Sequence, residues 1–192
     1  MTDLCSPSEE KAILRKDVLA RRAALPEIAR IEYGLQLADH AAALTLADGA
    51  TVAGFWPIRD EIDPRPLMER LRQKGHGLCL PVMTGPGLIF RRLERDTELV
   101  PAGFGCLEPG PQAEEVRPDV LLMPLAGFDG QGNRIGYGKA YYDNAIAALE
   151  RTGPLLCVGL AFSCQEVDRV PVEAHDKPLN GILTEHGYKA FR

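Results

Sequence analysis

The chain opens with apolar residues at the spacing of a helix and then changes to short, continuous apolar runs. Leu14, Val18 and Leu25 recur at intervals that place them on one side of a helix. They follow the segment 6–9, Ser-Pro-Ser-Glu, which combines an N-cap serine, a first-turn proline and a capping box. We therefore predict a helix that ends at the proline after Leu25, and a second, Ala- and Leu-rich helix over 27–46.

Beyond residue 50 the apolar residues gather in runs that are typical of buried strands. The runs predict strands at 51–56, 77–82, 88–93, 119–124, 155–162 and 182–184. Helices are predicted at 64–74 and 139–151, and the stretch 101–118, rich in Pro and Gly, is predicted as loop. Because apolar strands alternate with helices, the sequence predicts an α/β fold, with a mostly parallel sheet and helices on both faces.

Ligands of such sheets bind at the carboxyl ends of the strands. The loops that leave the predicted strands at those ends are 56–63, 124–138 and 163–180. We expect the functional residues to lie in these three loops.

Composition narrows the class of protein. The 192 residues, 45% of them hydrophobic, suit one domain over 1–192 with a full-sized core. We expect a cytoplasmic protein that does not bind membranes, because no apolar run approaches about 20 residues and the N-terminus is too polar for a signal peptide. The net charge of −5 argues against nucleic-acid binding. The five cysteines and four histidines have no zinc-site spacing, and we expect a monomer.

The loop at 126–139 is a candidate anion site. It contains five glycines, carries Arg134 and Lys139, and ends at a predicted helix start, where backbone N–H groups and the helix dipole favour a phosphate. It is not a Walker motif, because Asn133 and Ala140 stand where that motif needs glycine and a hydroxyl residue. The same composition is also found in long surface loops.

Two further pairs suit a nucleotide with its metal. Lys11 and Arg15 lie four residues apart, so we expect both on one exposed helix face, as a phosphate clamp or as an ordinary solvated basic face. Asp143 and Asp176 come from separate loops and can hold Mg²⁺ with waters and phosphate oxygens. A helix cap explains Asp143 equally well, and a turn explains Asp176. The carboxylates in 59–63 suit a polar heterocycle, a metal, or a cap for the next helix.

The order of these signals resembles the 5-formyltetrahydrofolate cyclo-ligase family, also called methenyltetrahydrofolate synthetases. The resemblance extends from Lys11 to Glu185, and its most specific part is the Arg-x-Gly-x-Gly-x-x-Tyr-Tyr-Asp segment that begins at Arg134. It implies a three-layer Rossmann-like fold and an ATP- and Mg²⁺-dependent enzyme. In the implied reaction, the formyl oxygen of 5-formyltetrahydrofolate attacks the γ-phosphate of ATP. Ring closure then gives 5,10-methenyltetrahydrofolate, ADP and phosphate.

The resemblance also implies a role for particular residues. Reduced folate would contact Trp56, Glu61, Tyr137 and Tyr141, and Mg²⁺ would be bound by Asp143 and Asp176. Arg134, Lys139 and Tyr141 would be the catalytic residues. ATP would be bound by Lys11, Arg15, Arg134, Ile135, Gly136, Tyr137, Gly138, Lys139, Ala140, Tyr141 and Tyr142.

Three positions depart from the usual family pattern. Ala140 replaces glycine before the two tyrosines, Asn144 replaces a common arginine, and Asn180 replaces an aspartate near the expected metal side. A single methyl group at Ala140 is compatible with a backbone pressed against phosphate if φ is negative and the Cβ points away. Two other functions stay open at this point: a paralogue that binds nucleotide or folate without converting it, and a sugar-phosphate isomerase or CoA-transferase-like enzyme.

Overall fold

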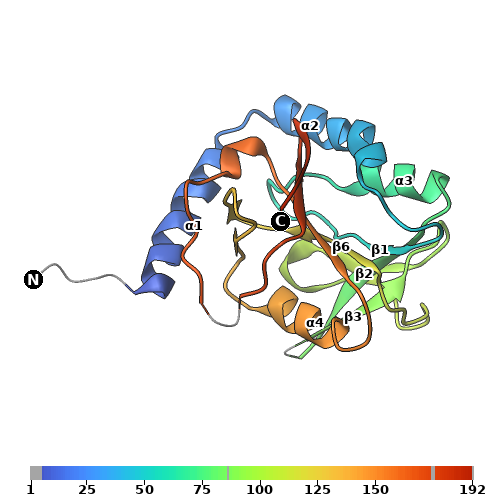
Figure 1. Ribbon diagram of the computed structural model, residues 1–192. Coiled ribbons are helices and arrows are strands. Elements are labelled where there is room, and N and C mark those ends of the chain that lie inside the picture. The colour runs from blue at the N-terminus through green and yellow to red at the C-terminus, as the bar shows by residue number, and fades with distance from the viewer. Residues whose placement is uncertain (1–5, 86, 174–175, 192) are drawn as a thin grey trace, which may run out of the picture.

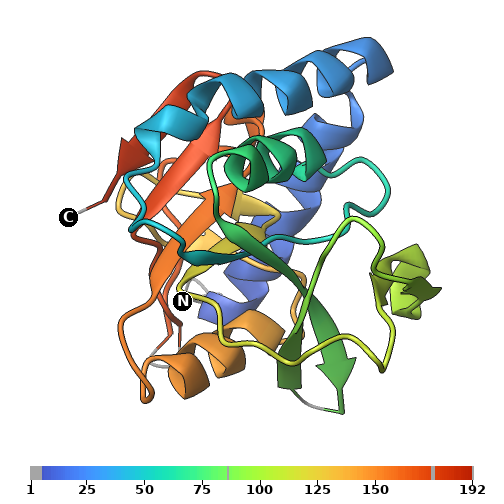
Figure 2. The ribbon, with the colours of Figure 1, turned by 90° about the vertical axis from the view of Figure 1, so that its right-hand side faces the viewer.

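The computed structural model describes residues 6–85, 87–173 and 176–191. Figures 1 and 2 show three layers, with a twisted sheet between helices on its two faces. The sheet has seven strands in the order β11-β10-β9-β6-β1-β2-β3, and its inner neighbours are parallel. Only the edge strands β3 and β11 run antiparallel to their neighbours. The predicted α/β fold is confirmed.

The described elements follow one another as α1 (Pro7–Ala23), α2 (Glu27–Asp39), β1 (Thr51–Ala53), α3 (Arg65–Gln73), β2 (Gly77–Thr84), β3 (Gly87–Arg92), β4 (Leu99–Pro101), β5 (Leu107–Pro109), β6 (Val120–Pro124), β7 (Gly127–Phe128), β8 (Arg134–Ile135), α4 (Tyr141–Leu149), β9 (Leu156–Leu160), β10 (Gly181–Thr184) and β11 (Gly187–Ala190). Short 3₁₀ turns lie at His40–Ala43, Gly103–Gly105 and Ser163–Gln165. In the described part of the chain, no helix is long and apolar enough to span a membrane.

Strand residues alternate between two cores. On β6, Val120 and Leu122 pack beneath α2 and α3, while Leu121 and Met123 pack against α4 on the other face. Every one of these four side chains is at least 97% buried. A strand buried on both faces has no polar alternation, which is why its sequence is apolar throughout.

The structure differs from the sequence prediction at four places. The second helix ends at Asp39 rather than 46, and a 3₁₀ turn follows it, where the ring of His40 hydrogen-bonds the carbonyl of Glu185. Short hairpins interrupt both predicted loops, β4 with β5 in 101–118 and β7 with β8 in 126–139. The edge strand β11 was absent from the prediction. These elements are two to four residues long, too short for a periodic pattern.

Helix α1 packs across the β7–β8 hairpin at the carboxyl edge of the sheet. Val18 lies fully buried against Ala126, Ile135 and Val170. Gly127 allows this approach, because a Cβ at that position would lie 3.2 Å from a methyl carbon of Val18. The contact brings the N-terminal helix to residues 126–140, which we call the glycine-rich segment (Figure 1).

Asp129 organises the turn of this hairpin. Its carboxylate is buried and accepts bonds from the backbone N–H groups of Gln131, Asn133 and Val170 and from the Asn133 amide, at 2.9–3.0 Å. Burial raises the pKa of this carboxyl group, but these donors outweigh burial, so its pKa lies below its ordinary value. The ionised form is thus part of the fold.

We expect Asp129→Asn to lower the free energy of unfolding at pH 7 by about 2 kcal/mol, because an amide nitrogen then faces backbone N–H donors. A depressed folded pKa contributes stability that is present above the unfolded pKa, near 3.9, and that is lost as pH falls through the folded value. Urea unfolding of both proteins from pH 7 to pH 3 should therefore show the difference shrinking below about pH 4. An equal difference at every pH would contradict this role of the charge.

Candidate active site

The three loops predicted to carry function meet beside α1. The Tyr137 hydroxyl in the glycine-rich segment donates to Glu61 Oε1 at 2.6 Å, which joins the second of these loops to the first. Val167 N donates to the Phe128 carbonyl at 2.8 Å, which joins the third to the second. The three loops that follow the predicted strands are therefore neighbours in the structure.

Arg15 is held against the glycine-rich segment. Its Nε donates to the Gly136 carbonyl at 2.7 Å, and its guanidinium lies 3.9 Å from where a Cβ of Gly138 would be. Gly138 has a φ of +85°, a conformation that suits glycine. Arg15 is half-buried, and its guanidinium lies alongside the exposed backbone of Gly136 and Gly138.

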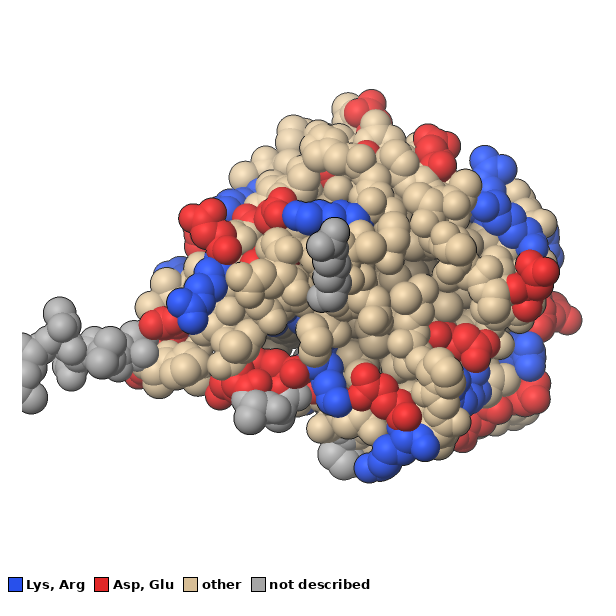
Figure 3. All heavy atoms as spheres, in the orientation of Figure 1, with Lys and Arg blue, Asp and Glu red and all other residues tan. Residues whose placement is uncertain are grey.

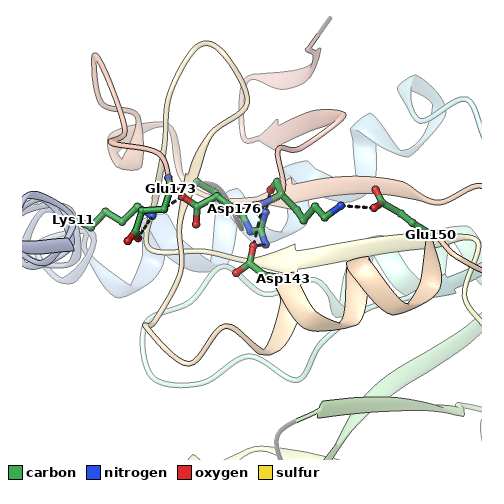
Figure 4. A network of polar contacts seen from close by, with 7 residues as sticks. Lys11, Asp143, Glu150, Glu173 and Asp176 are labelled. Atoms are coloured by element: carbon green, nitrogen blue, oxygen red, sulfur yellow. Dashed lines mark hydrogen bonds and ion pairs between the residues drawn. The ribbon is translucent and has the colours of Figure 1, made fainter. Parts of the chain in front are cut away.

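Lys11 does not lie on an exposed face, and that expectation is wrong. The residue is 8% exposed, and its Nζ lies 2.9 Å from Glu173 Oε2 and 2.5 Å from Asp176 Oδ2 (Figure 4). Burial lowers the pKa of Lys11, but the bonds to these two carboxylates outweigh it and leave the pKa raised. The two carboxylates draw the ammonium out of solvent.

A second ion pair lies in the same row of side chains in Figure 4. Asp143, in the first turn of α4, accepts a 2.7 Å bond from Arg134 Nη2 and a 3.2 Å bond from the backbone N–H of Lys177, both at Oδ1. Arg134 also donates to the Lys177 carbonyl. The two proposed metal carboxylates, Asp143 and Asp176, are therefore each paired with a cation, Arg134 and Lys11, and the adjacent residues Asp176 and Lys177 bring these two groups together.

The segment from Gly136 to Ala140 is exposed along its length, including Lys139. Tyr141 and Tyr142 are half-buried at the start of α4. Ile135 differs, because its side chain is 1% exposed and packs beneath α1, so only its backbone can face a ligand. The exposed backbone and the helix start form the kind of surface that binds anions.

Ala140 adopts a left-handed conformation, with φ +52° and ψ +14°, at the N-cap of α4. The condition of a negative φ is therefore not met. In this region the Cβ of an L-residue approaches its own carbonyl oxygen, which costs about 1–2 kcal/mol, whereas glycine adopts it freely. The strain explains in physical terms why glycine is suited to this position.

Glu61 contacts the glycine-rich segment through Tyr137, and Trp56 begins the loop that carries Glu61. Trp56 stacks with Arg65, whose guanidinium carbon lies 5.1 Å from the ring centre. Glu61 Oε2 accepts the Ile58 N–H at 2.9 Å. Burial raises the pKa of Glu61, and its bonds to Tyr137 and Ile58 oppose that rise.

Arg22 and Glu173 lie in this site, although sequence reasoning assigned them no role. Arg22 is 3% exposed and bonds both Asp60 and Tyr137. Helical spacing places Lys11, Arg15 and Arg22 on one face of α1, and this could have indicated a shared role. A helix face with several cations is normally interpreted as solvated surface.

Charge on the face of Figure 3 is mixed, with blue and red side chains interleaved around a tan centre. Among the described residues, no three His, Cys, Asp or Glu side chains form a metal-binding group. The Asn180 side chain accepts a 2.7 Å bond from the Cys157 N–H at the start of β9, where it aligns two strands. Asn144 is exposed on α4.

An α/β sheet with basic side chains and an exposed glycine-rich helix start at its carboxyl edge defines an enzyme for small anionic ligands. The 5-formyltetrahydrofolate cyclo-ligase family model matches residues 7–185, and the chain belongs to that family. Its curated relatives are enzymes, and membership favours the ring-closing ligase over the isomerase or transferase alternative.

Individual relatives agree with this assignment. A 5-formyltetrahydrofolate cyclo-ligase of Haemophilus influenzae is 30% identical over 184 residues, covering 92% of this chain and 98% of that protein. One from Escherichia coli is 36% identical over 143 residues, covering 70% and 77%. The solved 5,10-methenyltetrahydrofolate synthetase of Aquifex aeolicus superposes with a TM-score of 0.80 at 32% identity, covering 95% and 93%.

We expect Ala140→Gly to raise the free energy of unfolding by about 1 kcal/mol, since it relieves the left-handed strain. The matched control is Ala20→Gly, on the exposed face of α1, which should lower it by about 1 kcal/mol through helix propensity. Urea unfolding of the three proteins measures both. Destabilisation by the two glycines alike would contradict the strain at Ala140.

Proposed function

We propose that this protein uses ATP to cyclise 5-formyltetrahydrofolate to 5,10-methenyltetrahydrofolate, with release of ADP and phosphate. One observation carries the proposal: the same exposed segment contacts both the basic helix α1 and the carboxylate of Glu61. Arg15 bonds Gly136, and one residue further on Tyr137 bonds Glu61. Two ligands bound at these neighbouring contacts would have their reacting ends close together.

The phosphate side would consist of Arg15, Lys11, Lys139 and the backbone that leads into α4. Arg15 and Lys139 supply charge next to exposed backbone, and the first turn of the helix adds N–H donors. Lys11 would exchange part of its contact with Glu173 and Asp176 for the phosphates. The folate would lie against Trp56 and Glu61, because a carboxylate accepts from the N–H groups of its amino-oxo ring.

Asp143 and Asp176 fit a magnesium ion that arrives with ATP. Mg²⁺ in such sites uses one or two carboxylates, with phosphate oxygens and waters completing the shell. Asp143 uses only Oδ1 for its two bonds, to Arg134 and Lys177. When bound, the ion would neutralise charge on the phosphates. Arg134 and Lys11 hold the two carboxylates in place before the ligand enters.

The chemistry asks the chain mainly to align two ligands. The formyl oxygen would attack the γ-phosphorus, ADP would leave, and the second folate nitrogen would then close the ring as phosphate departs. Positioning and charge stabilisation account for most catalysis of phosphoryl transfer. We assign that task to three residues in or next to the exposed segment 136–140, namely Arg134, Lys139 and Tyr141.

The direct test is the absorbance of methenyltetrahydrofolate formed from 5-formyltetrahydrofolate, ATP and Mg²⁺. Turnover that requires all three, with one ADP per product, would support the proposal. Binding of either substrate without ADP release would instead identify a non-catalytic paralogue.

We expect Arg15→Ala to raise the KM for ATP about tenfold, because a charge-assisted bond to phosphate contributes about 1.5–3 kcal/mol. Its half-exposed side chain should contribute less than about 1 kcal/mol to stability. The control is Lys16→Ala, which removes a neighbouring, exposed charge of α1. Equal ATP kinetics for the two variants would make Arg15 ordinary surface.

We expect Asp143→Asn to move the Mg²⁺ dependence of turnover to more than about tenfold higher concentration, because an amide is a weaker ligand than a carboxylate. Glu150→Gln removes the same charge at the C-cap of the same helix and serves as the control, since Glu150 pairs with the Lys177 ammonium rather than with Arg134. Normal turnover of the Asp143 variant at wild-type Mg²⁺ concentrations would defeat the metal assignment.

A further inference from the structure

Arg22 connects three segments of the site from the last turn of α1. Its Nη2 lies 2.7 Å from Asp60 Oδ1, and its Nη1 donates to the Tyr137 hydroxyl at 2.7 Å. That hydroxyl donates in turn to Glu61 Oε1. The guanidinium therefore reaches the Glu61 carboxylate through a single phenol oxygen.

The burial of Arg22 is more than a stable fold of this helix requires. An arginine that is 97% buried costs desolvation, and its Nε is a buried donor without a hydrogen-bond partner among the described residues. An apolar side chain at this position of α1 would not carry that desolvation cost. Buried polar groups left partly unsatisfied are concentrated at functional sites.

We propose that Arg22 is a positioning residue for folate recognition, which acts on Glu61 through Tyr137. The inference rests on the proposed function. By donating to the phenol oxygen, Arg22 directs the Tyr137 proton to Glu61 and keeps that carboxylate charged in a desolvated place. The amino-oxo ring of the folate, with its N–H donors, needs an ionised acceptor at this position.

The groups that face Glu61 from every side support this role. They are Arg22 from α1, Asp60 from the same loop, Tyr137 and Tyr142 from the glycine-rich segment and α4, and Cys106 from the segment before β5. Burial raises the pKa of Glu61, and Arg22 is the cation among these groups that lowers it. Without that charge the pKa of Glu61 rises further, and the neutral acid persists to higher pH.

The test compares Arg22→Gln with Arg21→Gln, its neighbour on α1. Both variants remove one positive charge, but the Arg21 side chain is half exposed and pairs with Asp17. The measurement is the pH dependence of kcat/KM for 5-formyltetrahydrofolate, with the KM for ATP measured alongside. We expect the acid limb to move up by about one pH unit and the KM for folate to rise at least about tenfold in the Arg22 variant only. The KM for ATP should stay within about twofold.

Tyr137→Phe keeps the test open if Arg22→Gln does not fold, because it removes a single oxygen and breaks the same connection. It should shift the folate limb in the same direction, and Arg22→Lys should restore part of the shift. An acid limb unmoved in Arg22→Gln and Tyr137→Phe, or folate and ATP KM values that rise together, would overturn the proposal. The wild-type protein separates the two hypotheses: if it forms no methenyltetrahydrofolate, the proposed function fails first.

Discussion

The contact between α1 and the β7–β8 hairpin is the constraint on which the rest of the site depends. The close approach of Val18 to Gly127 leaves no room for a side chain at 127. Once this contact forms, the spacing of a helix decides where every other residue of the face lies. Val18 lies close to a whole number of helical turns from Lys11, Arg15 and Arg22, so all four residues share one face of α1. Lys11 meets the loop at 163–180, Arg15 meets the glycine-rich segment, and Arg22 meets both that segment and the loop at 56–63.

In an ordinary amphipathic helix the apolar residues face the core and the charged residues face solvent, and α1 departs from this pattern. The three buried residues of α1 are Val18 and the cations Lys11 and Arg22, and Leu14 and Leu19 are only partly buried, while Ile13 on the other side is 65% exposed. Burying cations is favourable only if acceptors meet them, and Glu173, Asp176, the Gly136 carbonyl, Asp60 and the Tyr137 hydroxyl do so. Hydrophobic contacts elsewhere therefore stabilise the fold, and α1 holds charged side chains at the carboxyl edge of the sheet.

That departure explains what the sequence could and could not predict. The buried strand β6 was predictable because four apolar residues in succession have one reading in an α/β fold. The choice of the three loops followed from the prediction of a parallel sheet, whose ligands bind at the carboxyl ends of the strands. The burial of Lys11 was not predictable, because its partners Glu173 and Asp176 lie more than 160 residues away. The conformation of Ala140 was missed for a related reason: alanine at a helix start favours a negative φ, and only the path of the loop imposes the positive one.

The same geometry has a consequence for how the two halves of the site act together. Arg15 bonds the backbone at Gly136 and Arg22 bonds the side chain of Tyr137, the next residue, so adjacent residues of one exposed segment are held by two turns of one rigid helix. The two contacts differ in kind, because Arg15 bonds the backbone carbonyl of Gly136, whereas Arg22 and Glu61 bond the hydroxyl at the end of the Tyr137 side chain. Under the proposed function, the folate side and the phosphate side would therefore meet at one short segment but depend on different atoms of it. Coupling between two sites requires a shared element whose state both ligands bias, and contacts with separate atoms limit that coupling.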